Sequence, residues 1–138
     1  MNIKGFLSLP HRFRWGGMDG DDCMTFAASW ALHAVGVDPA EGLRGTYRTK
    51  DEAHAIMATH GGPQAFMTGK LLAIGCRRVK QTRDGDIGLV RMLAGETYDD
   101  VRVTEVGAIR FGPLWASISP AGVIARRAEM IAAWRLPT

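Results

Sequence analysis

Cys23 is the residue whose type and position point most directly to chemistry. It follows Asp22 at the start of a predicted helix, where unpaired backbone amides carry a partial positive charge that lowers the pKa of a thiol. Three glycines lie just upstream, Gly16, Gly17 and Gly20. Backbone amides in such a turn could approach a carbonyl oxygen and stabilise its developing negative charge. The pattern is therefore compatible with a nucleophilic thiol beside an oxyanion hole.

The same segment also has a structural interpretation. Asp21 and Asp22 lie beside the thiol and would oppose its ionisation, because a neighbouring negative charge disfavours the thiolate. Free cysteine is also a common small apolar residue of protein interiors. The local sequence favours this structural role over the nucleophilic one, and both alternatives stay open at this point.

A nucleophilic cysteine needs a general base within hydrogen-bonding reach. The chain has histidines at four positions: His11, His33, His54 and His60. His33 is excluded, because ten residues along one helix correspond to a rise of about 15 Å and to a different face. His54 and His60 fall on a second predicted helix and its end, where solvated histidines are common, whereas His11 could fold back towards the thiol. His11 and His54 are therefore the weak base candidates.

Other groups of residues lack the spacing that a metal or cofactor site requires. Asp19, Asp21 and Asp22 resemble part of a calcium loop, but the twelve-residue pattern with its final glutamate is absent. Gly61-Gly62 and Gly85-Asp86 lack nucleotide-loop spacing. We therefore expect no metal and no cofactor.

The composition is that of one globular domain. The 138 residues are 46% hydrophobic and 22% charged, which suits a single domain over 1–138 with a packed core and excludes a disordered chain. Seventeen basic and fourteen acidic side chains give a net charge of +3. This excess is weaker than the clustered charge of a dedicated nucleic-acid-binding protein, so we expect no nucleic-acid partner.

The apolar segments are too short for a membrane span, and polar residues or glycines interrupt each of them. Residues 1–10 carry Lys4 and a very short apolar run, so no signal peptide is expected and synthesis is expected in the cytoplasm. Cys23 and Cys76 could form one disulfide, but a reducing compartment disfavours it.

Helical patterns dominate the first half of the chain and strand patterns the second. Alanines and long apolar residues with capping aspartates predict a helix from about Asp22 to Val35, ended by Gly36. Further helices are predicted over 51–61 and 64–73, and strands or apolar segments over 76–79, 87–90, 101–111, 114–118, 123–125 and 130–136. Helices followed by an antiparallel sheet indicate the α+β class.

Several short motifs occur in a specific order. They are Trp15-Gly16-Gly17, Asp22-Cys23-x-x-Phe26, Gly85-Asp86-Ile87-Gly88-Leu89-Val90 and Val106-Gly107-Ala108-Ile109. In this order they resemble the NlpC-type branch of the papain-like cysteine peptidases. The resemblance implies an α+β, papain-like (NlpC-type) fold, with N-terminal helices packed on a small antiparallel sheet. It also implies that Cys23 lies at the start of the first long helix and points towards that sheet.

A closer likeness is to a small-protein subgroup encoded in the tail modules of phages and gene transfer agents. It rests on Asp38-Pro39-Ala40, on Arg44-Gly45-Thr46-Tyr47-Arg48-Thr49 and on Ala133-Trp134-Arg135. This resemblance implies a location at the virion tail tip after synthesis in the host cytoplasm. The implied partners are the phage tail hub or other tail-tip proteins, with peptidoglycan as a further one for an active enzyme.

One departure from the family pattern decides between two functions. The family carries its general-base histidine just before Val-Gly-x-Ile, and this chain has Thr104-Glu105 there. A carboxylate with an ordinary pKa of about 4.3 is a weak base. The resemblance therefore implies a structural tail-tip or baseplate component with a degenerate cell-wall peptidase fold. The alternative is an active cysteine peptidase or amidase that cleaves peptidoglycan during phage entry.

Overall fold

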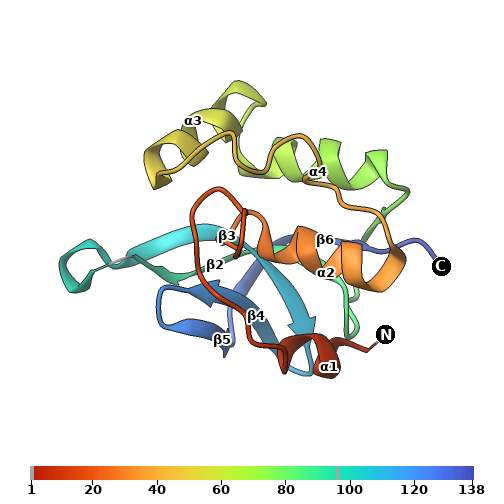
Figure 1. Ribbon diagram of the computed structural model, residues 1–138. Coiled ribbons are helices and arrows are strands. Elements are labelled where there is room, and N and C mark those ends of the chain that lie inside the picture. Colours follow the sequence, from red (N-terminus) through yellow and green to blue (C-terminus); the bar gives the residue numbers. More distant parts are fainter. Residues whose placement is uncertain (1, 96) are drawn as a thin grey trace.

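The computed structural model describes residues 2–95 and 97–138 and has the predicted α+β architecture (Figure 1). In these two ranges the helices are α1 (Ile3–Leu7), α2 (Phe26–Val35), α3 (Lys50–Thr59), α4 (Pro63–Ala73) and the short 3₁₀ helix η1 (Tyr98–Asp100). The strands are β1 (Arg77–Val79), β2 (Ile87–Ala94), β3 (Arg102–Phe111), β4 (Leu114–Ser119), β5 (Gly122–Arg126) and β6 (Glu129–Arg135). None of the helices described is long and apolar enough to cross a membrane.

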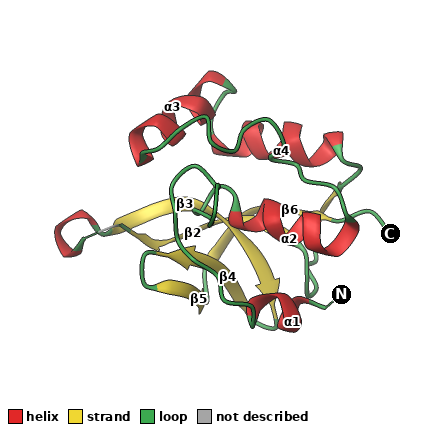
Figure 2. Cartoon of the chain, in the orientation of Figure 1, coloured by secondary structure: helices red, strands yellow, loops and turns green. Residues whose placement is uncertain are grey.

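The described strands form one antiparallel sheet in the order β1-β6-β2-β3-β4-β5. Strands β2 and β3 pair from Ile87↔Ile109 to Ala94↔Arg102. Strand β3 pairs with β4 over 109–111, so these two neighbours diverge towards the start of β3. Figure 2 shows α3 and α4 next to each other on one side of the strands, and β5 at the edge of the sheet beside β4. The part of β4 beyond its pairing with β3, 117–119, lines the space beside Cys23.

The sheet separates two apolar cores, because successive side chains of a strand point to opposite faces. Leu89 belongs to the core under α2 together with Phe26, whereas its neighbour Val90 belongs to the second core with Trp115. Cys23 packs against this second core. The thiol-bearing residue therefore contacts side chains of the sheet, in agreement with the orientation that the resemblance implies.

Two local differences between the structure and the prediction lie in the first 26 residues. Helix α2 begins at Phe26 instead of Asp22, because residues 22–25 form a turn that precedes it. Helix α1 was not predicted: the Asn2 side chain accepts from the Gly5 amide, and Phe6 is buried against α2. Periodicity does not reveal a helix this short, whose formation depends on the core that Phe6 joins.

Candidate functional site

Cys23 lies in the turn that leads into α2. The amides of Thr25 and Phe26 donate to the Asp22 carbonyl oxygen at 3.2 and 3.0 Å. The amides of Met24 and Thr25 also donate to Oδ1 of the Asp22 side chain, at 2.8 and 2.9 Å. Two of the amides expected to be free near the thiol, those of Met24 and Thr25, are therefore already bonded to a carboxylate.

The other oxygen of Asp22 is bonded to the upstream glycine turn. Oδ2 accepts from the Gly16 amide at 3.0 Å and from the Tyr47 hydroxyl at 2.6 Å, and the side chain is completely buried. Gly16 has a φ of 99°, and a Cβ there would overlap the Tyr47 carbonyl oxygen. The Gly16 amide thus binds a resident carboxylate and is not available to an oxyanion.

Arg44 holds the cysteine turn in place with hydrogen bonds from each of its guanidinium nitrogens. Nε and Nη2 donate to the two carboxylate oxygens of Asp38 at 2.8 and 3.2 Å. Nη1 donates to Asp21 Oδ1 and to the Gly17 carbonyl, and Nη2 also donates to Ser29 Oγ, all at 3.1 Å. Burial raises the pKa of Asp38, but the bonds from Arg44 outweigh it and hold that pKa below its ordinary value. Arg44 therefore ties the 38–44 segment to the cysteine turn and to α2.

A second ion pair joins the Gly-Asp motif to the end of the sheet. Arg135 donates from Nε and Nη2 to the two oxygens of Asp86 at 2.9 and 2.8 Å, and Asp86 is almost completely buried. The indole of Trp30 donates to the neighbouring Gly85 carbonyl at 2.8 Å. The Gly85-Asp86 motif is thus structural: Asp86 links the start of β2 to β6, and Gly85 links it to α2.

Cys23 faces a cavity of about 60 Å³ in the space between β3 and β4. Its described lining includes Phe13, Trp15, Lys50, His54, Val106 and Ile118. Residues of β2, β3, β4 and β5 line it, and so does the first part of α3. The Cys23 thiol therefore faces a mainly apolar space that is also lined by two basic side chains from α3, Lys50 and His54.

The thiol is neutral at ordinary pH. Burial raises the pKa of Cys23 to about 12, and the adjacent Asp22 carboxylate adds to the rise, whereas the Cys23 backbone amide and, to a smaller extent, Lys50 oppose it. A nucleophilic cysteine requires the opposite shift, towards the thiolate. Cys23 and Cys76 are both free.

The two base candidates lie in different surroundings. His54, on α3, is exposed and lines the same cavity as Cys23. The Nε2 atom of His11 lies 2.6 Å from the Phe6 carbonyl oxygen, and its ring packs on Phe6 and Phe26. The structure thus brings His54 to the thiol cavity and places His11 in the contact between α1 and α2.

Glu105 is a further titratable residue near Cys23. It lines another, smaller pocket that Cys23 also lines, together with Met57 and Met67. Its carboxylate lies 3.9 Å from the Arg91 guanidinium. The other two histidines have local roles: His33 packs on Trp30, and His60 Nδ1 lies 2.9 Å from a carbonyl oxygen of its own helix.

Sequence reasoning missed Lys50 and assigned no roles to Arg44 and Tyr47. Lys50 follows the N-cap residue Thr49, a cap signal that places it in the first turn of α3. Its contact with the cavity depends on tertiary packing. Among the described residues, no group of three or more His, Cys, Asp or Glu side chains could hold a metal ion.

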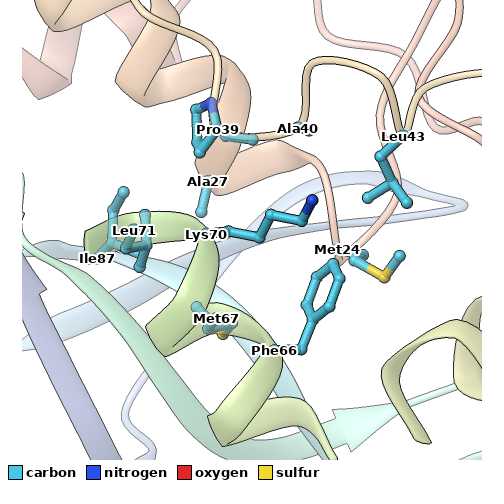
Figure 3. Close-up of a pocket in the computed structure, with 11 residues that line it drawn as sticks. Met24, Ala27, Pro39, Ala40, Leu43, Phe66, Met67, Lys70, Leu71 and Ile87 are labelled. Carbon is cyan, nitrogen blue, oxygen red and sulfur yellow. The ribbon is translucent and has the colours of Figure 1, made fainter. Parts of the chain in front are cut away.

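A third pocket lies between α2 and α4 (Figure 3). Its volume is about 30 Å³ and its walls are mostly apolar, among them Ala27, Phe66 and Leu71. Figure 3 shows the Lys70 side chain extending from α4 across it. Among the residues that the structure describes, no thiol or hydroxyl side chain lines this pocket, so the Cys23 cavity is the candidate site.

Comparison with known proteins gives one match. The family model described as "Domain of unknown function (DUF6950)" matches residues 9–136. No curated protein and no solved structure matches the chain. The matched range contains the cysteine turn, the Arg44 contacts and the described lining of the Cys23 cavity.

Proposed function

This chain belongs to the DUF6950 family, and we propose that it is a phage tail-tip or baseplate structural component with a degenerate papain-like, NlpC-type fold. The main observation against catalysis is that the Cys23 thiol is neutral. Cys23 has a pKa raised to about 12, and Glu105 occupies the position of the general-base histidine in the peptidases that the sequence resembles.

The papain-like part of the proposal is supported by the contacts between the sequence motifs that carry the resemblance. The Asp22-Cys23 turn leads into α2, and Cys23 packs on the sheet. Arg44 and Tyr47 of the tail-module motif bond to Asp21 and Asp22. Motifs that are far apart in the sequence therefore serve one common structure around the cysteine.

The structural role is supported by the surroundings of the thiol. General-base assistance is typically worth about 10²–10⁴-fold in rate. The Gly16 amide and the amides that follow Cys23 are bonded to the Asp22 carboxylate. Both the activation of the nucleophile and the binding of an oxyanion are thus weakened in the same turn.

The assembly role is supported by an exposed apolar patch on the β2–β3 hairpin, which projects from the body of the protein (Figure 1). Leu93 and Val103 face each other across the two strands and are 50% and 65% exposed. Tyr98, in η1, is 95% exposed. Exposed apolar side chains gathered in this way are typical of protein–protein contact sites.

We expect the purified protein to release no muropeptides from peptidoglycan above the level of Cys23→Ala. Without a thiolate and a positioned base, attack on an amide carbonyl is slow. The measurement is chromatography of soluble fragments after incubation with purified cell walls. Cys23-dependent release would refute the inactive interpretation.

The second candidate function is an active cysteine peptidase or amidase, which the position of His54 favours. His54 lines the same cavity as Cys23 and would be the base. In the same assay this candidate requires that Cys23→Ala and His54→Gln each abolish the release of muropeptides. His60→Gln is the matched control, since His60 lies outside the described lining of the cavity.

We also expect the protein to co-sediment with phage tails through the hairpin patch. Replacing Tyr98 with Ser and Val103 with Thr should lower the bound fraction at least about tenfold, because a few apolar residues usually dominate such contacts. Leu72→Ser is the control, since Leu72 on α4 is similarly exposed at 51%. A protein that stays monomeric and never co-sediments with tails would contradict the assembly role.

A further inference from the structure

Trp15 lies between two cavities. It lines the Cys23 cavity, and it also lines an open cleft of about 630 Å³ together with Arg14, Gly16, Tyr47 and Arg48. The shared tryptophan makes the two spaces neighbours on one surface. A ligand longer than a single side chain could therefore contact both.

The two spaces differ in polarity. The Cys23 cavity has mainly apolar walls, which include Phe13, Val106 and Ile118, and the thiol in it is neutral. Its volume of about 60 Å³ suits a small aliphatic group better than an aromatic ring. The open cleft has two guanidinium groups and exposed glycine backbone.

The charged side chains in both spaces are cationic. Arg14, Arg48 and Lys50 line them, and no carboxylate does so among the described residues. Arg14 has a weak, exposed partner in Asp19 at 4.0 Å, and Lys50 pairs with Asp100 at 3.1 Å. The charge of the combined surface therefore complements an anion.

We propose that the Cys23 cavity and the Arg14–Arg48 cleft form one binding site for a short peptide that carries a small aliphatic side chain next to a carboxylate. The aliphatic group enters the cavity, and the carboxylate meets Arg14 and Arg48 beside Trp15. This binding needs neither a reactive thiol nor a place in a phage tail.

The test is titration of the full chain with acetyl-Val-Gly bearing a free carboxylate, compared with its C-terminal amide. Calorimetry at low ionic strength gives the affinities, and the indole signal assigned to Trp15 by a Trp15→Phe variant reports the location. We expect the free acid to bind about tenfold or more tightly than the amide, the size of one charge-assisted contact. Equal affinities, or no saturable binding of the acid, would overturn the proposal.

Substitutions of charged residues test which side chains bind the carboxylate of the peptide. Arg14→Gln and Arg48→Gln should each weaken binding of the acid by about fivefold or more. Asp19→Asn should strengthen it, because it frees Arg14. Asn tolerates the left-handed backbone at position 19, where φ is 58°. Arg126→Gln on β5 is the control and should change nothing, whereas unchanged binding in both Arg14→Gln and Arg48→Gln would refute the site.

Protection of the Cys23 thiol from alkylation shows where the aliphatic group of the peptide binds. At alkaline pH the bound acid should slow the alkylation of Cys23 and leave that of Cys76 unchanged, as measured by peptide-resolved mass spectrometry. Equal rates for Cys23 with and without saturating ligand would show that the cavity is not occupied. Thermal unfolding of each variant separates lost binding from lost folding.

Discussion

Replacing Arg44 with methionine is expected to lower the free energy of unfolding by about 3–5 kcal/mol, the usual cost of breaking a buried ion pair from one side. The guanidinium is mostly buried and bonds to Asp38, Asp21, Ser29 and a backbone carbonyl. Methionine fills part of the space but leaves two carboxylates without their cation. For a domain of this size the loss corresponds to a fall of about 10–20 °C in Tm.

Two companion variants make the result for Arg44 interpretable. Arg48→Met removes an exposed arginine four positions later and should change Tm by little, since exposed substitutions usually cost within about 0.5 kcal/mol. Arg44→Lys keeps the charge but cannot reproduce the planar set of donors, and should recover a minor part of the loss. Calorimetry and urea unfolding measure all three. A near-native Tm for Arg44→Met would show that the cysteine turn holds without this network.

The second large effect is expected at Asp22. Asp22→Asn should lower the free energy of unfolding by about 2–4 kcal/mol, because the amide nitrogen cannot accept from the donors that now bond to the carboxylate. It should also make Cys23 more reactive. Burial is the first cause of the raised thiol pKa and the Asp22 charge is the second, so the variant lowers the pKa partway. Alkylation of Cys23 at pH 9 should rise about tenfold for each unit by which the pKa falls.

The pH dependence of stability gives an independent check. The Cys23 pKa is about 12 in the folded protein against an ordinary value of 9.0, so the unfolded chain loses this proton first. The contribution of Cys23 to stability is complete below pH 9 and falls as the pH rises towards 12. Asp22→Asn should reduce that fall. Asp99→Asn, an exposed change, is the control, and an unaltered Cys23 alkylation rate in Asp22→Asn would show that the carboxylate does not set the pKa.

The sequence predicted the fold class and most elements because local patterns determine them. Apolar spacing located α2, α3 and α4 to within a few residues, the acidic residues at its start supported α3, and alternation located β3. The partners of Arg44 were not predictable, because Asp21 and Ser29 are far from it in the sequence and bond to it through tertiary packing. The same holds for His54, whose place beside the thiol cavity depends on how α3 packs. Spacing could identify the candidate residues, but it could not choose between His11 and His54.

The two bonded oxygens of Asp22 also bear on how this protein could change over evolutionary time. On one side the carboxylate holds the amides that follow Cys23, and on the other it holds the Gly16 amide and Tyr47. A histidine introduced at Glu105 would supply a base, but the thiol would still lie beside a buried negative charge. Removing that charge first would loosen the turn that carries the thiol. A lineage that began from this arrangement would have to pass through a less stable or a still inactive protein before it hydrolysed anything.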